Sequence, residues 1–324
     1  MHRYALVVSI LIAAGQAGAA VTIDWATVGD PGNACDLQPQ GCFGSVDYTY
    51  RISKHEVTNA QYADFLNAVA VADTYALYDI GMGSGTGGIT RIGSPGGYSY
   101  SAIPARDKLP VVFVSFYDSL RFANWLHNGQ PTGAQGIGTT ESGAYALTAA
   151  GVAGNTIERN VDARIFLPSE DEWYKSAYYD SPTGSYFKYP SASNVQTNCA
   201  LPGTAANTAN CGSQVGDLSE VGVYSASLSP SGTFDQGGNV REWNETVVDG
   251  GGTLGAGLRG LRGGFYAGGP GELATASRST DLHSDPGSGG VGFRVAGVVP
   301  EPGTALLLGL GLGGLALRNK RWHS

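Results

Sequence analysis

Three segments of this sequence carry the pattern of a helix start, and they constrain the fold more than any other feature. In residues 58–61, 115–118 and 169–172, a Ser or Thr is followed three positions later by Gln, Asp or Glu. This spacing predicts an N-terminal capping box, in which the two side chains bond reciprocally to the backbone. Apolar residues recur at helical spacing behind each box, so we expect three short helices, the first over about residues 59–70.

The segments between these helices are long and rich in glycine, of which the chain holds 50 among 324 residues. Short alternating or apolar runs predict strands at residues 50–57, 111–115, 164–167, 240–243, 258–265 and 291–298. A hydrophobic content of 42% is ample for a core, so we exclude a disordered chain. Because helices and strands do not alternate regularly, the sequence predicts an α+β fold without βαβ units.

Both ends of the sequence carry the features of export signals rather than of a folded domain. Residues 1–20 combine a basic start, an apolar run and small residues, which predicts a secretory signal peptide. Residues 299–324 contain a Pro-Glu-Pro motif, an apolar run and a basic end. That apolar run is short for a membrane span, which normally needs ~20 residues. We therefore expect one domain over residues 21–298.

The last segment resembles the PEP-CTERM sorting signal of Gram-negative bacteria. Its parts occur in the expected order, with Val-Pro-Glu-Pro at 299–302, an apolar stretch at 305–317 and a basic cluster at 318–321. The resemblance implies a sorting protease of the exosortase type as a partner. It also implies contact with the membrane only transiently, through the C-terminal helix, and a final location at the cell surface or outside the cell.

The balance of charge argues against nucleic acid as a partner. The formal net charge is -8, and the basic residues form no cluster in the interior of the chain. Surfaces that bind nucleic acid carry clustered Lys and Arg side chains. We therefore exclude this class of partner.

The four cysteines indicate an oxidising compartment and form two local pairs, Cys35 with Cys42 and Cys199 with Cys211. Four cysteines allow three connectivities. We expect local pairing, because each pair brackets a loop rich in Gly, Pro or Asn. A zinc site with four cysteine ligands is the alternative, although the spacings differ from the usual C-x₂₋₄-C ligand pairs.

One glycine turn, residues 237–245, combines two glycines, two amides, two carboxylates and Trp243. Amide, carboxylate and carbonyl oxygens are the ligands that Ca²⁺ takes in proteins. Trp243 supplies a large apolar ring that would anchor the turn in a core. The other interpretation is a glycine turn that leads into a strand with one buried Trp.

Five segments in a fixed order carry a resemblance to a known family. They comprise residues 52–62, residues 114–126, Phe-Leu-Pro-Ser-Glu-Asp-Glu-Trp at 166–173, Gly-Asn-Val-Arg-Glu-Trp at 238–243, and Arg-Gly-Leu-Arg-Gly-Gly-Phe at 259–265 with Gly-Phe-Arg-Val-Ala at 292–296. From about residue 50 to residue 296 the chain resembles the formylglycine-generating enzyme, or sulfatase-modifying factor, family.

The resemblance implies a C-type lectin-like fold of the formylglycine-generating enzyme type, an α+β domain with short helices, short strands and long loops. It also implies structural Ca²⁺, which members of the family commonly carry. One calcium site would use Asn239 and Glu242 with nearby carbonyls. A second would fall near Asn210, Asp217 and Ser219.

The chain differs from the oxidase members of this family in the segment that would carry the copper ligands. The resemblance implies that oxidase members bind copper through two cysteines shortly after the Arg-Gly-Gly stretch, and use it with O₂ to convert a cysteine to formylglycine. This chain has no cysteine after Cys211 and many small residues at 266–278. We therefore expect no copper and no catalytic residues. Another branch holds non-haem iron through histidines on an added helical domain, which this sequence lacks.

The sequence therefore favours an exported, non-catalytic binding module for an envelope protein or an exopolysaccharide glycan. Loops on a rigid scaffold commonly carry recognition. We expect Tyr98, Tyr100, Tyr178 and Tyr179 to be exposed, with Tyr98, Tyr100 and Arg278 as candidate ligand contacts. Packing within the loops, or a structural ion pair for Arg278, is the other interpretation. Two further functions stay open, an oxidoreductase of the formylglycine-generating or non-haem iron type with a divergent site, and a structural component of the surface matrix.

Overall fold

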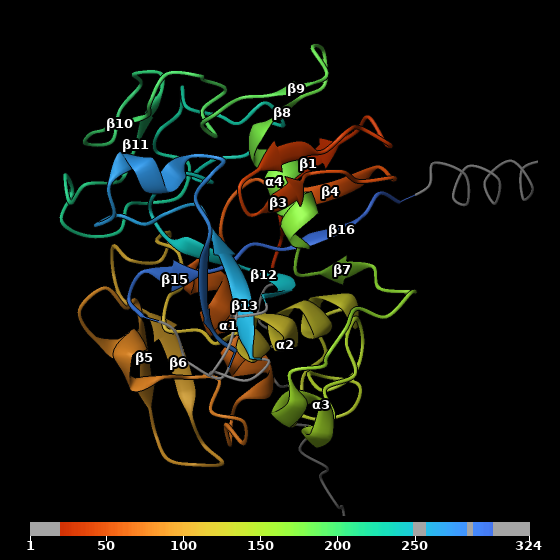
Figure 1. Ribbon diagram of the computed structural model, residues 1–324. Coiled ribbons are helices and arrows are strands. Elements are labelled where there is room, and N and C mark those ends of the chain that lie inside the picture. Colours follow the sequence, from red (N-terminus) through yellow and green to blue (C-terminus); the bar gives the residue numbers. More distant parts are fainter. Residues whose placement is uncertain (1–19, 249–256, 284–287, 301–324) are drawn as a thin grey trace, which may run out of the picture.

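The computed structural model describes residues 20–248, 257–283 and 288–300 (Figure 1). The helices within these ranges are short: α1 (Asn59–Val69), α2 (Phe116–His127), α3 (Ala149–Gly154), α4 (Glu170–Tyr178) and the 3₁₀ helices η1 (Ile80–Gly83) and η2 (Pro270–Leu273). They lie among many short strands and long loops, so the predicted α+β class is confirmed.

One four-stranded sheet joins the two ends of the described chain. Its strands lie in the order β1 (Trp25–Val28), β4 (Tyr50–Ser53), β16 (Ala296–Val298) and β7 (Ile165–Phe166). All of its pairs are antiparallel, and Ile52 of β4 faces Ala26 on one side and Ala296 on the other. The strand expected at residues 50–57 is therefore present but ends at Ser53.

A second four-stranded sheet carries the glycine turn and the Arg-Gly-Gly stretch. Its strands lie in the order β14 (Ser279–Leu282), β13 (Leu258–Arg262), β12 (Arg241–Val248) and β15 (Val291–Gly292). Glu242 of β12 pairs with Arg262 of β13 and with Gly292 of β15. In Figure 1 the β12–β13 pair crosses the centre of the molecule.

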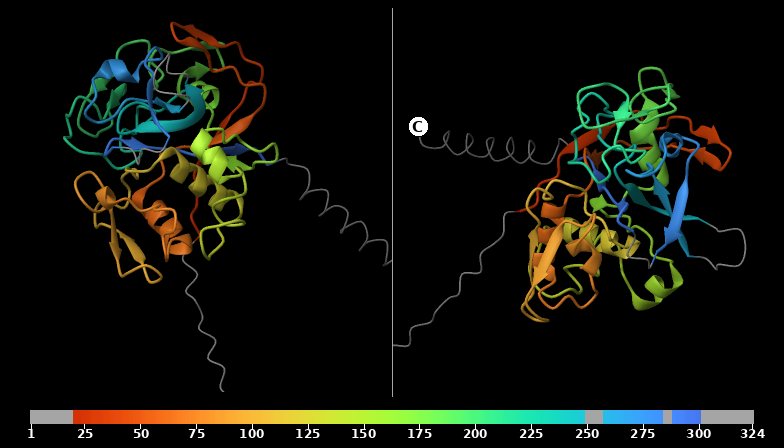
Figure 2. Two further views of the ribbon diagram at one scale, coloured as in Figure 1. Left: turned by 60° about the horizontal axis from the view of Figure 1, so that its bottom comes forward. Right: turned by 90° about the vertical axis from the view of Figure 1, so that its left-hand side faces the viewer.

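Four smaller sheets of two strands each lie within the long loops of the described chain. They are β2 (Asp36–Gln38) with β3 (Gly41–Phe43), β5 (Ile89–Ile92) with β6 (Ser99–Ala102), β8 (Tyr179–Asp180) with β9 (Ser185–Tyr186), and β10 (Asn198–Cys199) with β11 (Thr208–Ala209). The β5–β6 hairpin lies in the long glycine-rich segment between α1 and α2. Figure 2 shows this hairpin (orange) at the end of the molecule opposite the β8–β9 and β10–β11 pairs.

The three predicted capping boxes are confirmed. At the start of α1, the Thr58 hydroxyl accepts from the Gln61 backbone N–H at 3.3 Å, and the Gln61 side chain accepts from the Thr58 backbone N–H at 3.0 Å. The same reciprocal pair forms at the starts of α2 and α4. Each box satisfies N–H groups that have no partner within the helix, which is why the three helices begin where the sequence predicts.

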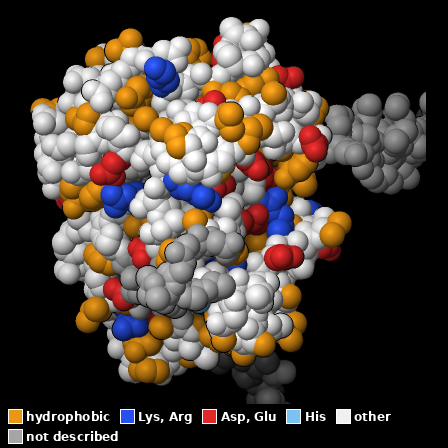
Figure 3. Space-filling view, in the orientation of Figure 1, with side chains coloured by type: hydrophobic (Ala, Val, Ile, Leu, Met, Phe, Trp, Pro, Cys, Tyr) orange, Lys and Arg blue, Asp and Glu red, His pale blue; other side chains and the backbone are white. Residues whose placement is uncertain are grey.

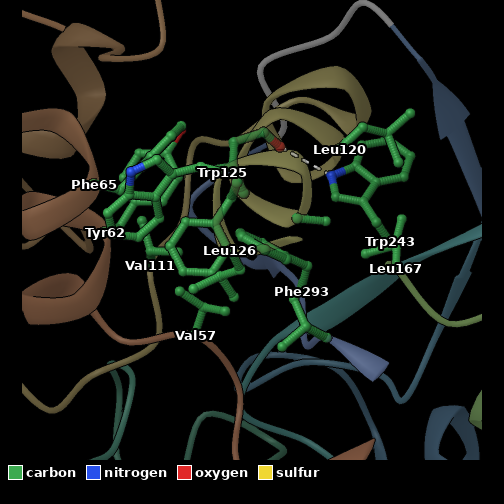
Figure 4. Packing of buried hydrophobic residues seen from close by; sticks show 14 of the residues in the cluster. Val57, Tyr62, Phe65, Val111, Leu120, Trp125, Leu126, Leu167, Trp243 and Phe293 are labelled. Carbon is green, nitrogen blue, oxygen red and sulfur yellow. Dashed lines mark hydrogen bonds between the residues drawn. The ribbon is translucent and has the colours of Figure 1, made fainter. Parts of the chain in front are cut away.

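The main core forms between α1 and α2 (Figure 4). Phe65 of α1 meets Phe122 and Trp125 of α2 with ring centroids 5.3 and 5.2 Å apart, and Tyr62 stacks 6.0 Å from Phe122. Phe293 closes this cluster from the segment between β15 and β16, 5.4 Å from Phe122. Burial of large aromatic side chains contributes most of the favourable free energy of such a core.

Trp243 anchors β12 to the same core. Its ring is fully buried, and its Nε1–H donates to the Val114 carbonyl at 2.9 Å. In Figure 4 its indole lies beside Leu120 and Leu167. The glycine turn is therefore attached to the core through the side chain that the sequence singles out.

The strand predicted at residues 111–115 is wrong. Phe113 lies at φ +61°, outside the β region, so the segment cannot continue a ladder. The Val111 backbone N–H still donates to the Val57 carbonyl at 2.8 Å. Because Val111, Val112 and Val114 are all buried, their apolar run reflects burial of an irregular segment rather than a strand.

The predicted signal peptide and almost all of the predicted sorting tail lie outside the described residues. Within residues 20–248, 257–283 and 288–300, no helix is both long enough and apolar enough to cross a membrane.

Candidate functional site

The glycine turn joins two loops that are distant in the sequence. Gly238 lies at φ +89°, and a Cβ at this position would approach the Asn210 carbonyl oxygen to 2.3 Å. Only glycine fits this approach. The Gly238 N–H donates to the Gly263 carbonyl, and the Asn239 N–H donates to the Asn210 carbonyl, both at 2.8 Å. The turn therefore joins the loop before Asp217 to the Arg-Gly-Gly stretch.

The amide of Asn239 is buried in a polar network. Its Oδ1 accepts from the Ser219 backbone N–H at 3.0 Å, and its Nδ2 donates to Glu56 Oε1 at 3.1 Å. Asn210 Nδ2 donates to the Asp217 carbonyl at 3.0 Å and lies 3.3 Å from Asn239 Oδ1. Three of the residues expected near calcium, Asn210, Asn239 and Ser219, are thus brought together.

Glu242 lies in a different environment, because its carboxylate is bound by Arg294. Arg294 Nε and Nη2 donate to Glu242 at 2.6 and 2.7 Å, and Trp173 Nε1 donates to it at 2.7 Å. None of these three side chains is exposed. Arg294 also donates to the carbonyls of Ser53 and Lys54, so the pair links the second sheet to β4.

The expected calcium ligands therefore fit a metal only in part. The carboxylate of Asp217 is bound by Arg106, at 2.8 and 3.2 Å, just as that of Glu242 is bound by Arg294. In the part of the chain that the structure describes, no group of three or more His, Cys, Asp or Glu side chains is arranged to hold a metal ion. Asn210 Oδ1, however, is a buried acceptor without a hydrogen-bond partner among the described residues, as a cation ligand would be.

Two acids beside Arg294, the buried Glu56 and the half-buried Asp235, were missed by the sequence reasoning. Burial raises the pKa of Asp235 to about 6 and raises the pKa of Glu56 well above its ordinary value, with the Arg294 charge opposing both shifts. Glu56 is 1% exposed, and its Oε2 has no hydrogen-bond partner in the part of the chain that the structure describes. Their burial depends on distant segments, so neither residue carried a local signal in the sequence.

Both predicted disulfides are confirmed, Cys35–Cys42 and Cys199–Cys211. They use all four cysteines of the chain. A copper site of the thiolate type needs free thiolates. The residues present therefore do not fit copper bound in the manner of the oxidase members.

A pocket of about 160 Å³ lies beside the Arg-Gly-Gly stretch. Gly263 and Gly264, at φ +101° and +69°, supply part of its wall without side chains. The remaining lining residues are mostly polar: Arg241, Leu261, Arg262, Glu272, Ser277, Arg278 and Ser279. On the face shown in Figure 3, Lys and Arg side chains lie next to Asp and Glu side chains rather than in a broad basic patch.

Arg278, a candidate ligand contact, lies in this pocket and is partly held by an ion pair. Glu170 accepts from Arg262 Nε at 2.8 Å through one carboxylate oxygen and from Arg278 Nη2 through the other. Arg241 donates to Glu272 at 2.6 Å on the other side of the pocket. The two interpretations of Arg278, structural pairing and ligand contact, are therefore compatible.

A larger pocket of about 480 Å³ lies at the opposite end of β12 and β13. Arg159 donates to both Glu172 and Glu245 at 2.6 Å, and the Tyr145 hydroxyl also donates to Glu245. Burial raises the pKa of Glu245, although the Arg159 charge opposes this shift. Arg259 is likewise bonded, to Asn155 Oδ1 at 2.8 Å. Arg159 and Glu245 therefore satisfy each other, whereas Arg259 is held by neutral acceptors.

The expected exposure of three tyrosines is wrong. Tyr100 is 4% exposed, because the β5–β6 hairpin packs on α1 and the Tyr100 hydroxyl donates to the Ala70 carbonyl. Tyr178 and Tyr179 are buried as well. Tyr98 is half-buried and packs against the Arg91 guanidinium at 4.4 Å. The tyrosine-rich surface that the sequence favoured for ligand stacking is therefore not formed by these rings.

Comparison with known families gives one match over most of the folded domain and another over the C-terminal tail. Residues 40–298 match the model of the sulfatase-modifying factor enzyme 1-like domain. The chain belongs to this family. Residues 298–321 of this family member match the PEP-CTERM protein-sorting motif, which indicates export and sorting to the cell surface in Gram-negative bacteria. Both resemblances drawn from the sequence are confirmed. Among curated proteins, none matches the chain.

Solved structures confirm the C-type lectin-like fold of this sulfatase-modifying factor domain. CarF is similar with a TM-score of 0.54 and 21% identity, over 87% of this chain and 100% of CarF. Variable protein 1 of Treponema denticola is similar with a TM-score of 0.54 and 18% identity, over 87% of this chain and 97% of that protein. At these identities the likeness concerns the fold alone.

Proposed function

We propose that this protein is an exported, non-catalytic binding module that recognises an envelope protein or an exopolysaccharide at the cell surface. The observation that carries the proposal is the state of the cysteines. All four are tied in disulfides, while a polar pocket of arginines and glutamates follows the Arg-Gly-Gly stretch. A scaffold of this kind keeps its loops rigid for recognition without supplying the thiolates that copper chemistry needs.

The export step belongs to the same proposal. A secretory signal peptide at residues 1–20 would direct the chain across the inner membrane, and an exosortase-type protease would act on the tail. The membrane contact would end when the C-terminal helix is removed. Disulfides fit this route, because they persist in oxidising compartments outside the cytoplasm.

Structural Ca²⁺ is a further part of the proposal, with Asn210 and Asn239 as its first ligands. The partnerless Oδ1 of Asn210 supports it. The carboxylates of Asp217 and Glu242 would have to exchange their arginine partners to join the ion. Asn239 Oδ1 would likewise have to release the Ser219 N–H. Chelation should then lower the melting temperature of the wild-type protein, and Asn210→Ala should remove that calcium dependence.

The decisive experiment measures metal content, oxygen uptake and retention on the same purified, exported protein. We expect no stoichiometric copper or iron, no O₂ uptake with a thiol peptide, and retention on extracellular polysaccharide or on envelope protein fractions. Stoichiometric copper or iron with O₂ uptake would instead establish an oxidoreductase with a divergent site. Self-association without retention on either partner would establish a structural matrix component.

A further inference from the structure

The pocket beside the Arg-Gly-Gly stretch carries one more positive charge than negative charge. Its three arginines are Arg241, Arg262 and Arg278, and the acids that pair with them are Glu170 and Glu272. Arg262 and Glu170 form a buried pair at 2.7 Å, with side chains 0% and 3% exposed. The surplus positive charge therefore lies on Arg241 and Arg278, the two arginines that are partly exposed.

Arg262 is fully buried and is held by its neighbours rather than by a ligand. Its Nε donates to Glu170, and its Nη1 donates to the carbonyls of Thr275 and Ser277. Its Nη2 lies 2.7 Å from Glu170 and makes no hydrogen bond within the described residues. Its role is to hold β13 and the loop before β14 in place.

Arg278 and Arg241 keep free donors. Among the described residues, Arg278 makes a side-chain hydrogen bond only from Nη2, and its Nε is buried without a partner. Arg241 likewise makes its side-chain hydrogen bond from Nη2 alone, to Glu272. A buried N–H of a charged group without an acceptor is costly, which favours an acceptor supplied by a ligand.

Aromatic rings hold both guanidinium groups against the wall of the pocket. Arg241 lies over the ring of Phe265 at 4.0 Å from the centroid, and Arg278 lies 5.5 Å from that of Phe43. Their side chains are only 23% and 15% exposed. A guanidinium fixed by its face presents its edge, and this planar fork matches the two oxygens of a carboxylate or sulfate.

We propose that this pocket binds a singly charged oxyanion, the carboxylate of a uronic acid or the sulfate ester of a sugar, between Arg241 and Arg278. A surplus of one positive charge matches a monoanion better than a phosphate dianion. The hydroxyls of Ser277 and Ser279 line the same pocket and can donate to the remaining oxygens. The inference rests on the proposed function, because it names the acidic group by which the surface polymer would be recognised.

The test uses titration calorimetry with glucuronate, glucose 6-sulfate, inorganic phosphate and glucose as probes. We expect the exported protein to bind glucuronate or glucose 6-sulfate, less phosphate and no glucose, with an affinity that falls as salt is added. Comparing the affinity for glucuronate with that for glucose 6-sulfate shows whether the pocket recognises a carboxylate or a sulfate ester. Equal binding of all three anions, or of none, would overturn the proposal.

Three single variants test whether the acidic sugars bind in this pocket. Arg278→Gln should lower the affinity by about tenfold or more, because it removes a charged donor. Arg91→Gln is the matched control, since Arg91 also pairs with an acid and packs on tyrosine rings, but lines no part of this pocket. Ser279→Asp should block binding while giving the free arginines an internal acceptor, so a stable but inactive variant distinguishes loss of the site from loss of the fold.

The same variants separate this inference from the proposed function. If Arg278→Gln and Ser279→Asp keep full retention on the polysaccharide and full affinity for the acidic sugars, the pocket is not the site, although the binding function stands. If the wild-type protein binds the acidic sugars but no polymer or envelope fraction, the pocket is established and the proposed function is wrong.

Discussion

Arg294 donates to both carboxylate oxygens of Glu242, at 2.6 and 2.7 Å, and neither side chain reaches solvent. Glu242 belongs to β12 in the second sheet, whereas Arg294 lies between β15 and β16 and also bonds to the end of β4. The ion pair therefore connects the two four-stranded sheets. Because both charges are removed from water, each depends on the other.

Replacing one partner of this pair should destabilise the fold strongly. Glu242→Gln leaves the Arg294 charge buried without its counter-ion, and we expect a loss of about 3–5 kcal/mol in the free energy of unfolding. Urea denaturation of the purified protein measures it. Asp24→Asn is the control, since Asp24 pairs with Lys54 at the surface and should contribute about 1 kcal/mol or less. Equal losses in the two variants would contradict this account.

The start of α4 offers a test of local stabilisation. Ser169→Ala removes the hydroxyl that accepts from the Glu172 N–H at 3.1 Å, and should cost about 1 kcal/mol. Thermal unfolding followed by circular dichroism measures the loss. Ser181→Ala, at an exposed position between β8 and β9, should change stability by less than about 0.5 kcal/mol. A smaller effect at Ser169 than at Ser181 would show that the box contributes nothing.

His55 should make the protein sensitive to acid. Burial lowers the pKa of His55 from 6.5 to about 4, and the Arg294 charge adds to this shift. The unfolded chain takes up the proton below about pH 6.5, whereas the folded protein takes it up only below about pH 4. Between these values protons favour the unfolded chain, so this contribution to stability falls as the pH falls.

His55→Gln removes that proton uptake. Unfolding free energies at pH 7 and pH 5 should then differ less in the variant than in the wild-type protein, although the variant also loses the stacking of His55 on Phe234. The comparison therefore uses the pH dependence rather than the absolute stability. Parallel pH profiles for the two proteins would exclude His55 as the acid-sensitive group.

The two disulfides should differ in their contribution. Cys211 is fully buried, and the Gly212 N–H beside it donates to the Gly268 carbonyl in the loop after the Arg-Gly-Gly stretch. Cys199→Ala with Cys211→Ala should therefore cost about 2–4 kcal/mol. The same double change at Cys35 and Cys42, where Cys42 is exposed, should cost less. The melting temperatures of the two double variants show which disulfide contributes more to stability. A lower melting temperature for the Cys35 and Cys42 variant would contradict this prediction.

Features made by neighbours in the chain could be predicted from the sequence. The three capping boxes form because the bonding groups lie three residues apart. The disulfides close loops of 7 and 12 residues, so their pairing is local as well. The family motifs occur in an order that pointed to the fold.

Burial and backbone conformation in the loops could not be predicted in this way. The apolar run at 111–115 has the pattern of a strand, yet Phe113 adopts a positive φ within it. Tyr100 alternates with polar residues in a glycine-rich stretch, yet it packs on α1. The backbone conformation of Phe113 and the burial of Tyr100 both depend on how the β5–β6 hairpin and the long loops pack against the helices. That packing cannot be inferred from the spacing of residues in the sequence.

The helix starts, the local disulfides and the residue types of the glycine turn follow from the sequence alone, because they depend on groups close together in the chain. The partners of the acidic side chains depend instead on the tertiary structure. Glu242 meets Arg294 across 52 residues, and Asp217 meets Arg106 across 111. Packing of the two sheets and the loops brings these groups together. It also buries Arg262 completely as a structural arginine, whereas Arg278 stays partly exposed, with an Nε that has no acceptor among the described residues.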